Sequence, residues 1–309
     1  MHNNDDVRPS AQRHEAAGWN AMRLSRRRML KRSGAALAAL GLIGTTGFGN
    51  SPSVQAKERG HVMSENTAAT KPIIVLVHGA WADGSSWSDV ISRLQEDDYT
   101  VVVPAVSLSS LSTDIAATRK FIGDLGAPAL VVGHSYGGAV ITGAATGLSN
   151  VKGLVYVAAF APNTGESLLG LTTQFGEKYG PTPLGQYFRP DGPFDADHPQ
   201  TLIYLDRANF GSVFVQDIDP ERAAVLAATQ RPPAVASFGE PLQGTPAWKQ
   251  FRTWYQVSAN DLVIGPAGER FFAQRMNAET IELESSHASP VSHPRAIAQL
   301  IKQAAQAVA

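Results

Sequence analysis

Short apolar runs alternate with segments of helical periodicity from residue 72 to the end of this chain. The runs are continuous in Val, Ile and Leu, which is typical of strands buried on both faces of a parallel sheet. Alternation of such strands with helices predicts an α/β domain with a doubly wound, mostly parallel sheet. We expect strands over residues 72–77, 100–104, 129–133, 153–159, 253–258 and 280–284, and helices over residues 86–96, 112–125, 139–148, 266–276 and 294–307.

The alternation stops between residues 161 and 249, a stretch that is rich in Pro and aromatic residues. Within it, Asp219-Pro220-Glu221 places a capping residue, a proline and an acid at the start of a helix that we expect to end near Thr229. Such an insertion is too long for a loop and too short to form a core of its own. We therefore expect a mainly helical cap over residues 162–249, inserted into a core made of residues 72–161 and 250–309.

The distribution of charge separates the N-terminal segment from the rest of the chain. The formal net charge is -1, but residues 1–56 carry eight bases and three acids, while residues 57–309 carry 18 bases and 24 acids. A basic run leads into uncharged, mildly apolar residues and then into small residues before Ala56, which is the layout of a secretory signal. We expect a signal peptide over residues 1–56, a flexible lead-in over residues 57–71, and a periplasmic or secreted protein.

The basic run resembles the twin-arginine export signature, with Arg26 and Arg27 as the arginine pair and Met29 in place of the usual phenylalanine. This resemblance implies that the chain folds before the export machinery carries it out of the cytoplasm. The apolar segment is shorter than the roughly 20 residues that a membrane span needs, so we expect no stable membrane anchor. Cleavage at a neighbouring small residue stays open, as does initiation at Met63, which would give a cytoplasmic form.

Composition excludes several classes of function. The chain has no cysteine, which rules out disulfides, thiolate metal sites and a cysteine nucleophile. An acidic body without a basic stripe is not expected to bind nucleic acid. No pair of residues has the spacing of metal ligands, and we expect neither a metal nor a cofactor.

Residues 133–138 place a serine among glycines at the boundary between a predicted strand and a predicted helix. Gly133-His134-Ser135-Tyr136-Gly137 follows the Gly-x-Ser-x-Gly pattern, which raises a serine hydroxyl above the carboxyl end of a sheet. A serine hydroxyl is a weak nucleophile and needs a nearby base that a third group orients. We therefore predict that Ser135 is a nucleophile and look for its partners among the histidines and acids.

The last two strands supply the candidate base and acid. His287 lies in the loop after the last predicted strand, at the edge of the sheet where α/β proteins place their chemistry. We favour it over His293, which stands at the start of a helix. Asp261 follows the preceding strand and is the favoured acid, with Glu166 as the fallback.

Acyl transfer also needs donors for the developing oxyanion, and a pocket for the substrate. The backbone N–H groups of Tyr136 and Ala80 are the predicted donors, since Gly79 allows the first turn to approach the serine closely. We expect Trp81 to line the substrate pocket. The aromatic residues of the cap would serve equally well as pocket walls or as the core of the cap.

The turn at residues 78–81, the serine turn, Asp261 and His287 together resemble the α/β-hydrolase superfamily over roughly residues 72–308. The first turn, His-Gly-Ala-Trp, is also similar to the branch that contains plant methyl esterases and hydroxynitrile lyases. Lyases of that branch carry a lysine directly after the catalytic histidine, where this chain has Ala288. The resemblance therefore implies a cofactor-free serine hydrolase rather than a lyase.

We expect this hydrolase to cleave small to medium, fairly apolar carboxylic esters through an acyl-enzyme. A lactonase, an amidase or a perhydrolase would use the same groups, and these alternatives stay open. A non-catalytic binding protein on a hydrolase scaffold is the alternative from a different class.

Overall fold

A six-stranded parallel sheet forms the centre of the computed structural model, which describes residues 71–309. Each strand overlaps a range expected from the sequence, so the predicted parallel sheet is confirmed. The predicted signal peptide and all but the last residue of the lead-in lie outside the described residues. In spatial order, the strands are β2 (Val101–Val102), β1 (Ile73–Val77), β3 (Ala129–His134), β4 (Val151–Val157), β7 (Thr253–Ser258) and β8 (Glu279–Leu283).

The two edge strands differ from the four inner strands. Along β3 and β7 every residue is buried, as expected for strands covered on both faces. In β8, at one edge, Glu279 and Glu282 are exposed. At the other edge, the run expected over residues 100–104 pairs over only two residues, Val101 and Val102.

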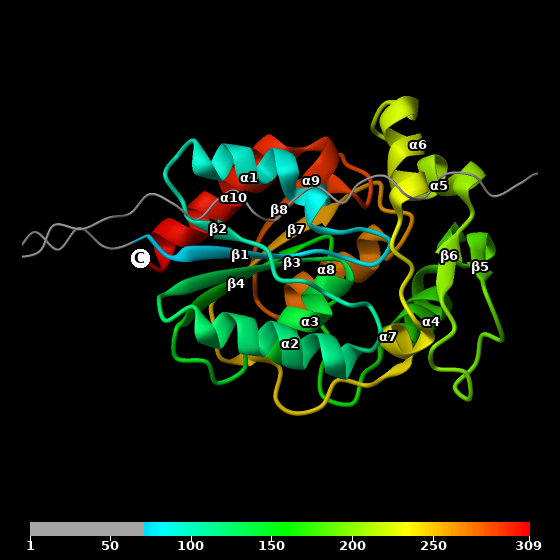
Figure 1. The fold of residues 1–309 in the computed structure, drawn as a ribbon, viewed down its shortest axis with the longest axis horizontal. Coiled ribbons are helices and arrows are strands. Elements are labelled where there is room, and N and C mark those ends of the chain that lie inside the picture. The colour runs from blue at the N-terminus through cyan, green and yellow to red at the C-terminus, as the bar shows by residue number, and fades with distance from the viewer. Residues whose placement is uncertain (1–70) are drawn as a thin grey trace, which may run out of the picture. The chain divides into compact units, whose positions relative to one another are not determined.

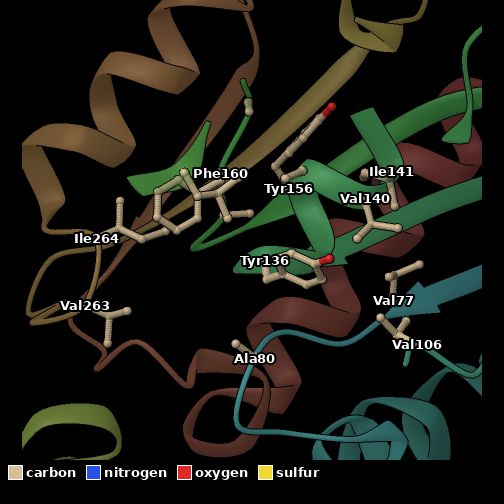
Figure 2. Packing of buried hydrophobic residues seen from close by; sticks show 14 of the residues in the cluster. Val77, Ala80, Val106, Tyr136, Val140, Ile141, Tyr156, Phe160, Val263 and Ile264 are labelled. Atoms are coloured by element: carbon tan, nitrogen blue, oxygen red, sulfur yellow. The ribbon is translucent and has the colours of Figure 1, made fainter. Parts of the chain in front are cut away.

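Helices cover both faces of the sheet, as Figure 1 shows. Successive residues of a strand point to opposite faces, so Ile74 and Leu76 pack in one layer while Val75 and Val77 pack in the other. The first layer contains α1 (Ser88–Gln95) and α10 (Pro294–Ala307). The short helix α9 (Ser289–Ser292) and the 3-10 helix η1 (Gly84–Trp87) pack against α1. The second layer contains α2 (Leu111–Asp124), α3 (Tyr136–Ala144) and α8 (Pro266–Arg275), and part of its core is drawn in Figure 2. Of the helices in residues 71–309, none has the length and apolar character needed to cross a membrane.

Most of the chain between β4 and β7 forms a cap beyond the carboxyl ends of the strands (Figure 1). The cap ends earlier than the expected residue 249, because the chain after α7 runs back along α3, where the Thr146 hydroxyl donates to Thr245 O at 2.8 Å. The expected helix after Asp219 is present, and the Asp219 side chain accepts a hydrogen bond from the N–H of Arg222. The cap also contains a small antiparallel pair of strands that the sequence did not predict. Its elements are α4 (Leu168–Tyr179), η2 (Pro183–Tyr187), β5 (Phe188–Pro190), β6 (Ile203–Leu205), α5 (Arg207–Phe214), α6 (Pro220–Thr229) and α7 (Val235–Gly239), whereas η3 (Ala247–Lys249) packs against α3.

Trp81 joins the cap to the first turn of the core. Its backbone N–H donates to Arg231 O at 3.0 Å, and its indole Nε1 donates to Ile203 O at 2.6 Å. The indole ring is buried among three aromatic rings of the cap, with centroid separations of 5.6 to 6.1 Å: Phe188, Phe214 and Phe238. The cap therefore rests directly on the turn that follows β1.

The contact between α2 and α3 generates a stability prediction. Gly143 and Gly123 are the penultimate residues of α3 and α2. A Cβ at Gly143 would lie 2.5 Å from Ile115 Cδ1, whereas a Cβ at Gly123 would have only one neighbour, at 4.0 Å. We expect Gly143→Ala to lower the free energy of unfolding by about 1–2 kcal/mol, because it overpacks the interface. Gly123→Ala should raise it by roughly a few tenths of a kcal/mol through helix propensity. Urea denaturation of both variants measures the difference, and equal effects would contradict this packing argument.

Candidate active site

Ser135 stands at a sharp left-handed turn between β3 and α3. Its backbone has φ 53° and ψ -123°, a conformation that non-glycine residues seldom adopt. Close packing around the turn requires the neighbouring glycines. A Cβ at Gly133 would lie 2.6 Å from Gly137 O, and a Cβ at Gly137 would collide with Val77 O. A Cβ at Gly79 would lie 2.7 Å from Ser135 Cβ, which shows how closely the turn after β1 approaches the serine.

The Ser135 hydroxyl does not cap the helix that it precedes. Ser110 and Ser167, at the equivalent positions before α2 and α4, each accept a hydrogen bond from a backbone N–H of the first helical turn. Ser135 makes no such bond, although it occupies the same position before α3. Its hydroxyl is therefore not used in capping, and the residue is 3% exposed.

Asp261 and His287 form a buried hydrogen-bonded pair. They follow β7 and β8, which are parallel neighbours, so their loops leave the same edge of the sheet. His287 Nδ1 donates to Asp261 Oδ2 at 2.7 Å, and both side chains are fully buried. Because Nδ1 holds the proton, the neutral ring carries a lone pair on Nε2, and this atom has no hydrogen-bond partner among the described residues. This is the tautomer that a general base needs.

The surroundings of Asp261 favour its ionised form. Oδ1 accepts hydrogen bonds from the backbone N–H groups of Val263 at 2.5 Å and Ile264 at 3.2 Å. Burial raises the pKa of Asp261, but the neighbouring His287 and the hydrogen bonds from His287 and Val263 outweigh it and hold the pKa well below its ordinary value. Asp261 is therefore an anion at neutral pH.

Glu269 is a second buried acid beside this pair, and the sequence reasoning missed it. Its Oε2 accepts a hydrogen bond from the Ser258 N–H at 2.8 Å, and its oxygen, the Asp261 oxygen and the His287 nitrogen lie within 4.8 Å of one another. Burial and the neighbouring Asp261 raise the pKa of Glu269 well above its ordinary value. The sequence does contain a signal for the burial of Glu269, because this residue lies on the same face of α8 as the apolar residues Phe272 and Ala273.

This trio is also the group of ligand atoms in residues 71–309 whose spacing could hold a metal ion. A metal at His287 Nδ1 would have to displace the proton that this nitrogen shares with Asp261. The arrangement fits a hydrogen-bonded pair better than a metal centre.

The two predicted oxyanion donors come from the two turns that approach each other closely at Gly79 and Ser135. Tyr136 begins α3, so its N–H has no acceptor within the helix. Its phenol donates to Asp114 Oδ2 at 2.8 Å, which fixes the side chain away from the serine turn. In the turn after β1, the N–H of Trp81 donates to the cap. The N–H of Ala80, in contrast, has no backbone acceptor among residues 71–309. Figure 2 shows Ala80 and Tyr136 in the same buried cluster.

His134, which the sequence reasoning set aside, supports the loop of His287. Its Nε2 donates to His287 O at 2.9 Å, and the two ring centroids are 4.9 Å apart. Burial and the neighbouring His287 lower the pKa of His134 to about 3, so the ring is neutral at neutral pH. It acts as a neutral donor next to the serine.

The fallback residues have other partners. Glu166 forms an ion pair with Arg275, whose guanidinium donates to it at 2.5 and 2.8 Å, and it also accepts the Asn163 N–H. His293 is half-buried, with Nδ1 3.7 Å from Asp217 Oδ2. Ser292 ends α9, and His293 occupies the N-cap position of α10.

A small, mostly apolar cavity lies beside these groups. Trp81 forms part of its wall. Phe214 also lines the cavity, and its ring meets the His287 ring edge-on at a centroid distance of 5.0 Å. Further lining comes from His134, Phe210, Leu226, Ala288 and Val291. Some cap aromatics thus border the cavity, while others, such as Phe175, pack in the core.

Comparisons with known proteins agree with this architecture. Alpha/beta hydrolase nvfD of Aspergillus novofumigatus (strain IBT 16806) is 27% identical over 258 residues, covering 76% of this chain and 97% of that protein. A carbendazim hydrolyzing esterase of Nocardioides sp. (strain SG-4G) is 36% identical over 110 residues, covering 31% of this chain and 46% of the esterase. The crystal structure of a pyrethroid hydrolase from Sphingobium faniae JZ-2 matches with a TM-score of 0.64 at 22% identity, covering 77% of this chain and 98% of that one.

The match to a protein family spans most of the folded core and the cap. Residues 74–300 match the family described as the alpha/beta hydrolase family. This range includes Ser135, Asp261 and His287, together with the sheet that positions them. The chain therefore belongs to the α/β hydrolase family.

Proposed function

We propose that this α/β hydrolase is a serine esterase that cleaves small to medium, fairly apolar carboxylic esters. The observation that carries the proposal is the buried His287–Asp261 hydrogen bond of 2.7 Å, which leaves His287 Nε2 free. Ser135 stands nearby in a strained turn, next to His134, whose ring contacts His287. A serine, a histidine with the correct tautomer and an anionic acid are the components of a hydrolytic triad.

The reaction proceeds through two acyl transfers. Ser135 Oγ attacks the ester carbonyl while His287 Nε2 accepts its proton, and Asp261 stabilises the resulting imidazolium. The N–H groups of Ala80 and Tyr136 hold the oxyanion. His287 returns the proton to the leaving alcohol, and a water molecule that His287 activates then hydrolyses the acyl-enzyme. Nε2 makes no hydrogen bond to Ser135 in the free protein, and such bonds tighten when substrate binds.

The cavity supports the choice of substrate class. Its mostly apolar walls suit an apolar acyl or aryl group. A relative that shares 36% identity over part of its length is named as an esterase, in keeping with ester hydrolysis. Ala288 follows His287 and offers no charge to a cyanide leaving group, so the lyase chemistry of the methyl esterase branch is not part of the proposal.

The charged leader supports a proposal on location. Arg26 and Arg27 precede a short apolar segment and the small residues before Ala56, so we propose export by the twin-arginine route and work in the periplasm or outside the cell.

Replacing Ser135 tests the nucleophile. We expect Ser135→Ala to lower kcat for p-nitrophenyl acetate by on the order of 10⁴-fold or more, because the acyl-enzyme cannot form. The variant should also lose labelling by a fluorophosphonate. Ser112→Ala, at an exposed position of α2, is the matched control and should keep both properties. Full turnover by Ser135→Ala would overturn the proposal, and a panel of esters, lactones and amides separates the remaining substrate classes.

Replacing Phe214 tests whether the cavity binds the acyl group of the substrate. Phe214→Leu enlarges the space beside His287, so we expect the ratio of kcat/KM for p-nitrophenyl octanoate to that for acetate to rise by roughly 10-fold. Phe194→Leu changes an exposed aromatic residue of the same cap and should leave the ratio unchanged. A ratio that does not move in Phe214→Leu would place the acyl group elsewhere.

The leader generates a prediction on export. Replacing Arg26 and Arg27 together by lysine removes the arginine pair that the export pathway reads while keeping the charge. We expect the protein to stay in the cytoplasm of a host with a functional twin-arginine pathway, as measured by fractionation and immunoblotting. Replacing Arg8 and Arg13 by lysine is the control, and unchanged export of the Arg26 and Arg27 variant would show that another route carries the protein.

A further inference from the structure

Glu269 faces the rear of the predicted triad from the first turn of α8. The residue has no exposed surface, and its Oε2 accepts the Ser258 N–H at 2.8 Å. Its other oxygen, Oε1, is buried and accepts no hydrogen bond from the described residues. Asp261 and His287 each place a polar atom within 4.8 Å of the Glu269 carboxyl group.

Within residues 71–309, no buried lysine or arginine lies beside Glu269 to compensate a second negative charge. The groups that face Glu269 are Asp261, His287 and the Tyr255 phenol, and the phenol donates to Ala159 O at 2.5 Å. Arg270 follows Glu269 in α8, but its guanidinium is nearly half exposed and pairs with Glu282. Two carboxyl groups that share a dry site cannot both ionise, so a proton must be held between Asp261 and Glu269.

The number of donors decides which acid holds this proton. Asp261 receives three hydrogen bonds, from His287 Nδ1 and from the N–H groups of Val263 and Ile264. Glu269 receives one, from Ser258. Donors stabilise the anion, so the negative charge belongs on Asp261 and the proton on Glu269.

We propose that Glu269 is a neutral carboxylic acid whose Oε1–H donates a hydrogen bond to Asp261, and that it thereby acts as a positioning residue for the His287–Asp261 pair. The inference rests on the proposed function for its catalytic meaning. No bond breaks in this role, since the proton stays on Glu269 throughout the reaction. The orphaned Oε1 atom gains a partner, and Asp261 gains a fourth donor.

A hydrogen bond from Glu269 changes how strongly the Asp261 carboxylate stabilises the protonated ring of His287. A fourth donor draws negative charge away from the oxygen that faces the imidazole, which weakens this stabilisation. Removing the donor returns the charge to that oxygen and favours the protonated ring. If Glu269 were instead an anion, removing it would disfavour the protonated ring.

The sign of this change is measured on two variants. Glu269→Gln keeps a neutral donor of the same shape, so the acid limb of the kcat/KM profile should stay where it is. Glu269→Leu lacks the donor and should move the acid limb up by roughly one pH unit. Glu282→Gln, an exposed substitution of the same type, is the control and should leave the profile unchanged. A downward shift in Glu269→Gln, or no shift in a folded Glu269→Leu, would overturn the proposal.

Infrared spectroscopy tests the proton directly and needs no activity. At neutral pH in D₂O the protein should show the C=O stretch of a protonated carboxylic acid, which Glu269→Gln loses and Glu282→Gln keeps. An active serine esterase without this band would overturn the role of Glu269 and leave the proposed function intact. A protein that shows the band but hydrolyses no ester would overturn the proposed function and leave Glu269 as a neutral donor to Asp261.

Discussion

The left-handed backbone at Ser135 is the constraint on which the arrangement of the site depends. A side chain in this conformation is strained, and the surrounding structure has to hold it. The Ser135 carbonyl accepts the N–H groups of Gly138 and Phe160, while its own N–H donates to Val157 O in β4. These bonds tie the turn to the middle of the sheet. The glycines around it, at positions 79, 133 and 137, are then required by space, because any side chain there would overlap backbone or Ser135 itself.

A second requirement is that the loops after β7 and β8 keep their shape while carrying buried polar groups. The hydroxyl of Ser289 donates to Gln256 Oε1 at 2.7 Å, and Gln256 Nε2 donates to the Ser258 hydroxyl at 3.0 Å. The Ser285 hydroxyl also donates to Ser258, at 2.9 Å. A buried network whose members are paired in this way fixes one geometry, because any displacement leaves an unpaired polar atom. Hydrogen bonds from the end of β7 thus hold the loop that contains His287 on both sides of the histidine.

Sequence reasoning predicted what depends on local pattern. The six strands, five of the core helices and the helix after Asp219 follow from apolar periodicity and capping residues, which act over a few positions. The serine turn has the same local character, since its glycines are neighbours in the chain. The length of β2 was overestimated, because apolar residues at a sheet edge do not reveal how many of them pair.

What the sequence did not reveal depends on contacts between distant segments. Glu269 reads as an ordinary acid in the first turn of a helix until α8 is packed against β7, where the carboxyl group becomes buried beside Asp261. His134 contacts a carbonyl 153 residues away. Such pairings depend on how the elements pack in three dimensions, and a single chain gives no periodic signal for them.

The short cap segment that contains Gln216 and Asp217 follows Phe214, whose ring covers His287. Gln216 Nε2 donates to Asn260 O at 2.6 Å, next to Asp261, and Asp217 Oδ2 accepts the Ser286 N–H at 2.8 Å, next to His287. One short segment therefore supports both loops from outside, the one that carries Asp261 and the one that carries His287. Displacing it would remove both supports together, so the positions of these two side chains depend on the cap as well as on the sheet.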